Sequence, residues 1–433
     1  MTNWGELRRY VTGAVVTPDD PDYDAVRAPM IANYADVRPA AIVRAATQAD
    51  VVAAIRFART QDLRLTPRSG GHCFAGRSSA GDIVLDVSGL RGVTWSDGLA
   101  EVGAGVRLPA LYEALAAHGI TVPGGCGPTV GVAGLTLGGG IGVLGRRYGL
   151  TCDRLRRAEI VLADGTTTVC DDEHEPDLFW ALRGAGGGLV GVVTSFVFET
   201  VPAPRTACVR LTWPAERSLD LADAWQSWAP VAPDPIAATL RLTTAGALLD
   251  ATAADADPEP SISEFVRLVG APTTDDRIVL PYKEAKQHLA GPAAETGGQF
   301  VGRSEFFAEP VPRAALAEVI DALPDGAELS FTALGGEYAR VPVDATAFAH
   351  RAAAFVIEHT TEVPLADLPA AQQWADRSSQ TLHPHGTGGV YANFPVPGTD
   401  PLDPRYHGTN RDRLLRVLDR YDPGRWFTAI GVG

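Results

Sequence analysis

Residues Pro67-Arg68-Ser69-Gly70-Gly71-His72 form the loop from which the interpretation of this chain starts. Three small residues in succession let the backbone pass close to a ligand, because glycine has no Cβ atom. Successive amide N–H groups in such a loop form a concave site for anionic oxygens. His72 stands at the end of the loop. The stretch therefore predicts a site for an anionic ligand with an imidazole beside it.

Length, composition and charge limit the class of protein. The chain has 433 residues, of which 45% are hydrophobic and 21% are charged, as in ordinary globular proteins. This length is too great for one simple core, so we expect two domains or one large composite. The net charge of −15 argues against nucleic acid or an anionic membrane as a partner. No apolar run is long enough to predict a membrane span.

The cysteines and the start of the chain indicate a cytoplasmic protein. Met1-Thr2-Asn3-Trp4 lacks the basic and apolar regions of a signal peptide. The 5 cysteines are scattered and odd in number, so they do not predict a disulfide framework. They are Cys73, Cys126, Cys152, Cys170 and Cys208.

Hydrophobic patterns and turn residues predict short elements in the first 200 residues. Thr47 with Asp50 three positions later predicts the start of a helix. Ser96-Asp97-Gly98 and Ala163-Asp164-Gly165 predict hairpin turns. Strands are expected at 39–46, 64–68, 82–86 and 191–200, helices between Pro109 and Gly119 and at 175–182, and a glycine-rich loop and helix at 124–145.

The composition changes at Val201-Pro202-Ala203-Pro204, where we place a domain boundary. The pattern divides the chain into 1–204, a second domain at 205–385, and 386–433. In the second domain we expect helices near 218–229, 261–268 and 312–322, and strands near 207–213, 328–334 and 353–361. The last segment predicts a strand, a loop and a helix from Arg411 to Tyr421.

A second glycine cluster, Gly138-Gly139-Gly140-Ile141-Gly142, is typical of a turn that approaches a pyrophosphate. By itself it is a weak signal, because surface turns use the same residues. The chain has neither a Walker A loop nor a Gly-x-Gly-x-x-Gly motif after a strand. A nicotinamide-type Rossmann domain is therefore not expected.

Taken together, the motifs resemble the berberine-bridge-enzyme-like branch of the vanillyl-alcohol-oxidase superfamily, which has the PCMH-type FAD-binding fold. The resemblance extends from about residue 38 to 427. The motifs that carry it are Arg68-Ser69-Gly70-Gly71-His72, Pro123-Gly124-Gly125, Val130-Gly131-Val132-Ala133-Gly134, Gly138 to Gly142, Tyr148 to Asp153, Gly184 to Gly188, Gly191 to Thr194, Arg340 to Phe348, Tyr391-x-Asn393-Phe394 and Tyr421-Asp422-Pro423.

The resemblance implies an α+β protein of two domains with FAD as cofactor. Both chain ends would form the FAD domain, and the middle segment a substrate domain whose antiparallel sheet, flanked by helices, roofs the flavin. His72 matches the histidine that bonds the flavin 8α-methyl carbon. The positions implied to bind FAD are Arg68, Ser69, Gly70, Gly71, His72, Gly125, Cys126, Gly127, Thr129, Val130, Gly131, Gly134, Gly139, Gly140, Gly142, Gly191, Val192, Tyr391 and Asn393.

Cys126 does not align with the cysteine that forms a second flavin bond in many relatives. Without a gap, Gly127 occupies that position and Cys126 falls one residue early. In an extended loop a shift of one residue turns a side chain to the opposite side. We therefore expect a single covalent bond through His72, with a double bond as the alternative. Otherwise Cys126 is a small buried thiol.

The catalytic base is less certain from the pattern alone, because Phe394 stands where relatives often carry a proton-accepting tyrosine. Counting from His350-Arg351 places His359 at the position of a glutamate in the relatives, with Glu358 beside it. On a strand only one of these two side chains can face the flavin, and His359 would titrate near neutral pH. Further candidates are Glu337 and Tyr338, in a strand expected before the Arg340-Val341-Pro342 motif, and Tyr391.

The expected function is that of an FAD-dependent oxidase. It would take hydride from a C–H next to an alcohol or amine of a small molecule, and O₂ would be the acceptor. Val130 matches a position where relatives with valine admit dioxygen. A dehydrogenase or oxidative cyclase with another acceptor, or a non-catalytic flavoprotein, are the alternatives. His383-Pro384-His385 lacks a third ligand nearby, so no metal site is predicted.

Overall fold

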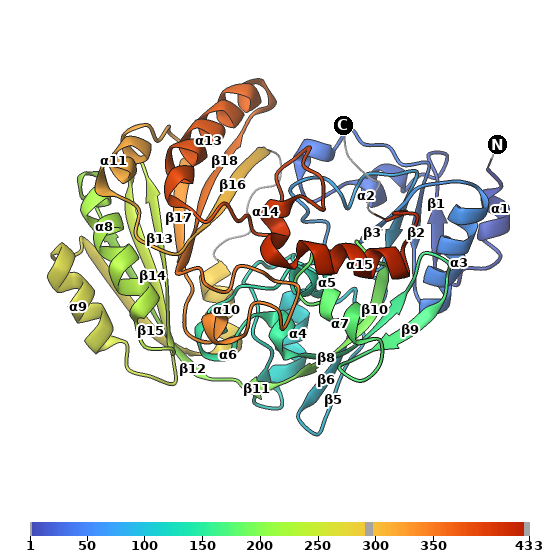
Figure 1. The fold of residues 1–433 in the computed structure, drawn as a ribbon, viewed down its shortest axis with the longest axis horizontal. Helices are drawn as coiled ribbons and strands as arrows, with labels where there is room; N and C mark the ends of the chain where they lie inside the picture. The colour runs from blue at the N-terminus through green and yellow to red at the C-terminus, as the bar shows by residue number, and fades with distance from the viewer. Residues whose placement is uncertain (1, 291–297, 428–433) are drawn as a thin grey trace.

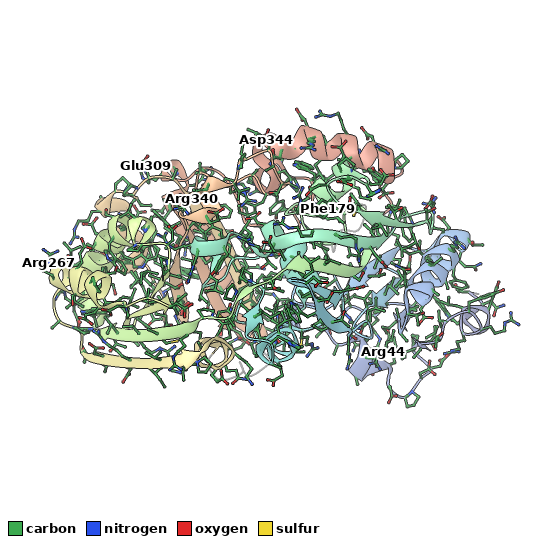
Figure 2. The ribbon with its side chains drawn as sticks, turned by 90° about the horizontal axis from the view of Figure 1, so that it is seen from below. Arg44, Phe179, Arg267, Glu309, Arg340 and Asp344 are labelled. Carbon is green, nitrogen blue, oxygen red and sulfur yellow. The ribbon has the colours of Figure 1, made fainter. Side chains whose placement is uncertain are left out.

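The computed structural model describes residues 2–290 and 298–427, which form two parts lying side by side (Figure 1). One part contains the N-terminal strands together with the last helix, and the other is built around one large sheet. Figure 2 shows them end to end from below, with Arg44 in the first part and Arg267 in the second. In the described residues, no helix is long and apolar enough to cross a bilayer.

The first part contains a mostly parallel sheet and an antiparallel sheet. In the parallel sheet β2 and β3 both pair with β4 in parallel, while β1 adds an antiparallel edge. Its order is β1 (Ala14–Val16), β2 (Ala41–Arg44), β4 (Ile83–Asp86) and β3 (Leu65–Arg68). The antiparallel sheet has the order β5 (Val93–Ser96), β6 (Leu99–Gly103), β10 (Val192–Glu199), β8 (Leu155–Val161) and β9 (Thr167–Cys170). A short pair joins β7 (Ile120–Thr121) to β11 (Val201–Pro202).

Helices from both ends of the chain cover these sheets. Leu414, Val417 and Leu418 of the last helix belong to the same buried core as the N-terminal strands, and Figure 1 shows that helix across the first part. The helices are α1 (Trp4–Leu7), α2 (Tyr23–Arg27), α3 (Gln48–Thr60), α4 (Leu108–Ala116), α5 (Val132–Leu137), α6 (Gly145–Tyr148), α7 (Pro176–Ala181), α14 (Pro404–His407) and α15 (Arg411–Tyr421).

The second part is an antiparallel sheet with helices on one face. Its alternating strands bury one set of side chains beneath those helices, so the other set faces the first part. The order is β15 (Thr274–Pro281), β12 (Arg205–Trp213), β14 (Gly246–Ala254), β13 (Ile236–Thr243), β17 (Ala327–Ala333), β18 (Phe355–Val363) and β16 (Gln299–Phe307). The covering helices are α8 (Ser218–Trp228), α9 (Glu259–Val269), α11 (Arg313–Asp321) and α13 (Leu368–Leu382). Two further helices contact the first part: α10 (Tyr282–Ala290) contacts α4, and α12 (Glu337–Arg340) contacts α6.

Most predicted elements are confirmed where a local signal defines them. Thr47 caps α3 in a complete capping box with Asp50, and the two predicted hairpins form at β5–β6 and β8–β9. Strands β13 to β16 and the helix α13 were not predicted. The strand expected just after residue 386 is wrong, because residues 386–394 contain only turns and irregular chain. The segment from Glu337 is a short helix instead of a strand.

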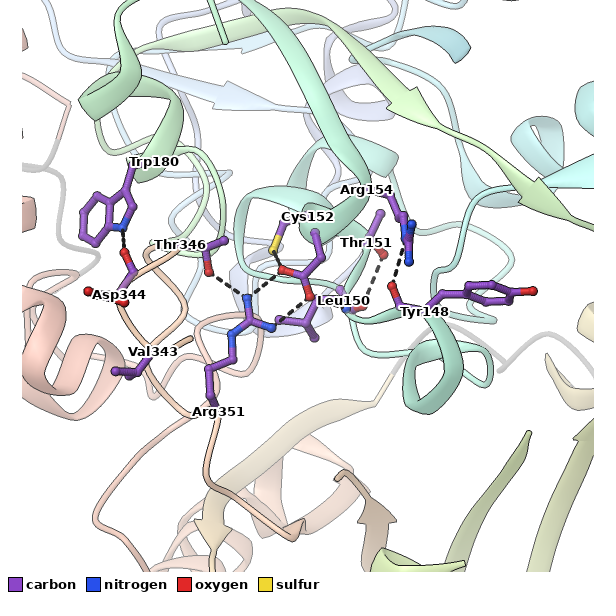
Figure 3. A network of polar contacts seen from close by, with 12 residues as sticks. Tyr148, Leu150, Thr151, Cys152, Arg154, Trp180, Val343, Asp344, Thr346 and Arg351 are labelled. Atoms are coloured by element: carbon purple, nitrogen blue, oxygen red, sulfur yellow. Dashed lines mark hydrogen bonds and ion pairs between the residues drawn. The ribbon is translucent and has the colours of Figure 1, made fainter. Parts of the chain in front are cut away.

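A buried ion pair joins the segment after α12 to the first part (Figure 3). The Arg351 guanidinium donates to both carboxylate oxygens of Asp153, at 2.8 and 2.6 Å, and also to Thr346 Oγ1. Both charged side chains are less than a tenth exposed. Asp153 also accepts the Leu150 amide N–H, which anchors the turn after α6.

Candidate functional site

A cavity of about 570 Å³ lies between the two parts. Its walls come from the glycine loops on one side and from the open face of the large sheet on the other. The loop after β3, the loop before α5 and the segment around Gly187 line the first side. Side chains of β13, β14, β17 and β18 line the second. Segments far apart in sequence therefore meet around one space.

The loop 69–72 packs directly against the loop that leads into α5. A Cβ atom on Gly70 would lie 2.4 Å from the Gly131 amide nitrogen, so only glycine allows this approach. Arg68 holds the base of the loop, because its buried guanidinium donates to the carbonyls of Val26 and Arg27. In the described residues, the amides of 69–72 donate no backbone hydrogen bond. These N–H groups are available to an anionic ligand.

His72 lines the cavity at the end of this loop. Its Nε2 lies 2.8 Å from Thr129 Oγ1, which leaves Nδ1 without a hydrogen-bond partner among the residues that the structure describes. Burial, and secondarily the nearby Arg107, lower the pKa of His72. The imidazole is therefore neutral near pH 7, with an uncommitted ring nitrogen.

The C-terminal return holds the second glycine cluster. Tyr391 Oη accepts the amide N–H groups of Gly140 and Ile141 at 3.0 and 3.2 Å, and Asn393 Nδ2 donates to the same oxygen. Burial raises the pKa of Tyr391 to about 12. The phenol is thus protonated at physiological pH and serves as an acceptor for backbone amides. This contact explains why the glycine cluster and the Tyr391-x-Asn393 motif occur together.

The cavity contains most of the positions predicted to bind FAD. Those lining it are Arg68, Ser69, Gly70, Gly71, His72, Gly125, Cys126, Val130, Gly131, Gly134, Gly142, Gly191, Val192, Tyr391 and Asn393. Four predicted positions do not line the cavity: Gly127, Thr129, Gly139 and Gly140. Thr129 contacts His72 instead, and Gly140 contacts Tyr391.

The two neighbouring candidates for the base lie on opposite faces of β18. Glu358 lines the cavity. His359 is 1% exposed beneath α13, where its Nδ1 lies 2.8 Å from Ser378 Oγ. Burial lowers the pKa of His359 to about 3. The structure thus does not place His359 where it could contact a ligand in the cavity, because the strand turns consecutive side chains to opposite faces.

Glu358 has the environment expected of a proton-accepting group. Burial, and then the negative charge of Glu328, raise the pKa of Glu358 to about 8. Glu337 lies on α12 outside the cavity lining, where it pairs with Arg340 at 3.3 Å. The Tyr338 hydroxyl forms hydrogen bonds with the backbone N–H and carbonyl of Gly142. Among the predicted candidates, Glu358 is the carboxyl that faces the cavity.

Several polar cavity residues were not identified from the sequence. Arg241 and Asp250 form an ion pair in the wall, and Thr239, Thr252 and Thr332 lie beside them. The alternation of residues 236–243 could have indicated Thr239 and Arg241, because these two positions alternate with the buried residues Ala238, Leu240 and Leu242. Phe74 and Phe394 add aromatic rings to the lining, with centroids 5.6 Å apart.

Cys126 lies beside a buried lysine of α10. Lys286 Nζ donates to the Gly124 carbonyl at 2.6 Å and interacts electrostatically with Cys126. His72, in contrast, contacts Thr129. The loop residues therefore direct Cys126 and His72 to different partners.

These features fit the FAD that the motifs imply. The amides of 69–72 can bind a pyrophosphate, and the cavity is lined both by that loop and by the large sheet. His72, with a free ring nitrogen, lines the same cavity. A dinucleotide requires amide N–H donors and a backbone that approaches it closely, and the loop 69–72 supplies both. The residues present can therefore hold FAD.

Comparison with known proteins agrees with this geometry. Residues 39–171 match the model of an FAD binding domain family. The FAD-linked oxidoreductase YgaK of Bacillus subtilis is 30% identical over 437 residues, which cover 96% of each chain. (R)-6-hydroxynicotine oxidase of Paenarthrobacter nicotinovorans is 36% identical over 211 residues, covering 47% of this chain and 45% of its own.

The fold also matches a solved structure along nearly its whole length. Berberine-bridge-enzyme-like protein 1 of Physcomitrella patens superposes with a TM-score of 0.92 at 24% identity, covering 98% of both chains. The predicted α+β fold of the PCMH type is therefore confirmed.

Proposed function

Given that the chain belongs to the FAD-linked oxidoreductases that include the berberine-bridge-enzyme-like proteins, we propose that it is an FAD-dependent oxidase of small molecules. The substrate carries a C–H bond next to an alcohol or amine. FAD, when bound, accepts a hydride from that carbon and passes two electrons to O₂, which gives H₂O₂. One observation carries the proposal: the loop of His72 and the carboxyl of Glu358 line the same cavity.

The flavin is attached through His72 in this proposal. The Thr129 hydroxyl holds Nε2, so Nδ1 is the nitrogen that bonds the flavin. In this proposal Nε2–H donates to Thr129 Oγ1, so the neutral imidazole, whose pKa is lowered by burial, keeps the lone pair of Nδ1 as the nucleophile. Cys126 falls one residue before the position of the second flavin-bonding cysteine, and we therefore propose a single covalent bond over a double one.

Glu358 is the proposed general base. It takes the O–H or N–H proton of the substrate while hydride leaves the neighbouring carbon. Its raised pKa matches a base that works at neutral to mildly alkaline pH. Tyr391 and Asn393 hold the glycine cluster against the cofactor, and Val130 in the cavity wall is the position where dioxygen enters.

We also propose which segments of the chain bind the cofactor and which bind the substrate. Residues 1–204 and 386–433 bind FAD, and residues 205–385 bind the substrate through the open face of the sheet. The shared core of α15 with the N-terminal strands supports the first assignment. The position of Glu358 on β18 supports the second.

The test begins with acid precipitation of the purified protein. Flavin that stays in the pellet, and that mass analysis finds on the peptide containing His72 alone, supports the single bond. Flavin bridging the His72 and Cys126 peptides would contradict it, and flavin in the supernatant would refute covalent attachment. Oxygen uptake by the dithionite-reduced enzyme then tests the oxidase assignment. Slow reoxidation by O₂ with fast reoxidation by a quinone dye would favour a dehydrogenase.

A further inference from the structure

The open face of the large sheet places an arginine in line with Glu358. Arg241 on β13 pairs in register with Ser330 on β17, and Ser330 pairs with Glu358 on β18. Neighbouring strands lie about 4.8 Å apart, so the backbones of Arg241 and Glu358 are separated by about 10 Å. Both side chains line the cavity. One small molecule can therefore contact both of them.

In the described residues, Arg241 shares its ion-pair partner Asp250 with a second arginine, Arg210. Asp250 accepts from Arg210 Nε at 2.8 Å and also from Arg241, so two guanidinium groups share one carboxylate. Asp276 lies near Arg210, on the side away from Arg241. Glu328 interacts electrostatically with Arg241, and burial raises the pKa of Glu328.

Arg241 also keeps hydrogen-bond donors for a ligand. Only its Nη2 has a partner in the described part of the chain, which is Asp250. The side chain is 33% exposed, and it is exposed toward the cavity. An arginine has five N–H donors, so an open edge of the guanidinium faces the space where substrate would lie.

We propose that Arg241 binds a carboxylate of the substrate. The substrate is then a small organic acid whose oxidisable alcohol or amine carbon lies a few bonds from that carboxylate. Arg241 fixes the acid group, and the spacing along the sheet brings the reactive carbon to Glu358. The planar edge of one guanidinium matches a carboxylate. Oxidation of the carbon near Glu358 rests on the proposed function, whereas binding of the carboxylate by Arg241 does not depend on it.

The experiment compares matched pairs of ligands on the purified holoenzyme. Benzoate and mandelate are titrated against benzamide and mandelamide, which have the same shape without the charge. Isothermal calorimetry measures each Kd, and perturbation of the flavin absorption shows that the ligand lies in the cavity. Calorimetry reports binding even if no ligand is oxidised, so failure of the proposed oxidase would be seen separately, as absence of bound flavin or of turnover.

Each acid is expected to bind at least tenfold more tightly than its amide. Arg241→Gln should remove this preference, and Arg241→Lys should retain part of it. Arg313→Gln is the matched control, because it removes one positive charge from an exposed ion pair on α11. The preference should survive in that variant.

Equal affinity of acid and amide in the wild-type protein would overturn the proposal without any variant. So would absence of binding by either member, or an acid preference that persists in Arg241→Gln. Phenyl phosphate serves as a further probe. If it binds more tightly than benzoate and depends on Arg241, the site is for a phosphate and the carboxylate assignment is wrong.

Discussion

Glu358 and His359 are adjacent in sequence, yet they face opposite sides of the large sheet. The Glu358 carboxyl lines the cavity, whereas the His359 side chain is hydrogen-bonded to Ser378 of α13 on the other face. Alternation along β18 causes this separation. One residue is thus available to a substrate and the other belongs to the packing of the sheet against its helix.

Replacement of Glu358 by Gln should slow flavin reduction by about 10²- to 10⁴-fold, the range for loss of a general base. The amide keeps the size of the side chain but cannot take a proton. Anaerobic stopped-flow absorbance of the flavin measures the rate with any substrate found by screening. His359→Asn is the control at the neighbouring residue, and it should lower the thermal stability without slowing flavin reduction. Flavin reduction that is unchanged in Glu358→Gln would exclude this residue as the base.

The rate of flavin reduction should rise with pH until the pH exceeds about 8. Burial and Glu328 raise the pKa of Glu358 to about 8, and the carboxylate is the form that accepts the proton. Below this pKa each unit of pH should change the rate about tenfold. A pH series of single-turnover rates checks this prediction. A rate that falls between pH 6 and pH 8 would contradict it.

Substitution of Glu328 by Gln should move this pH profile to lower pH. The charge of Glu328 is one of the two causes that raise the pKa of Glu358, the larger being burial. Removal of that charge makes the Glu358 carboxylate easier to form, so the direction of the shift is toward acid. The same single-turnover series measures it. A shift toward alkaline pH would show that Glu328 acts on Glu358 in another way.

Substitution of Asp153 by Asn should destabilise the protein by about 3–5 kcal/mol, because Arg351 then remains buried without a counter-ion. Chemical denaturation of the holoenzyme measures the free energy of unfolding. Asp223→Asn is the control, since Asp223 forms an exposed pair with Arg313 and should cost at most about 1 kcal/mol. Equal losses in both variants would show that burial does not make the Arg351–Asp153 pair in Figure 3 costlier to break than an exposed pair.

Thr129→Val should lower the fraction of flavin that is covalently bound. The hydroxyl lies 2.8 Å from His72 Nε2 and keeps the ring in one orientation. Acid precipitation after expression gives the fraction of flavin in the pellet. His72→Ala is the reference variant with no covalent flavin. Full attachment in Thr129→Val would show that the ring needs no such partner.

Local signals in the sequence were enough for several elements of the first part. The capping box of Thr47 and Asp50 and the two Asp-Gly turns involve residues close together in the chain, so their structures do not depend on distant contacts. The glycine motifs likewise indicated the ligand loops, because a close backbone approach admits few residues other than glycine. His72 and the cofactor class followed from these motifs.

The catalytic and substrate-facing residues depended on long-range pairing. Arg241, Ser330 and Glu358 come from three strands and form a row only through the sheet register. Whether Glu358 or His359 faces the cavity depends on which side of β18 the helix α13 covers, and a shift of one residue would exchange them. Local patterns therefore specified the loops that we propose to hold the cofactor. The packing of the sheet between α13 and the first part decided which side chains face the cavity.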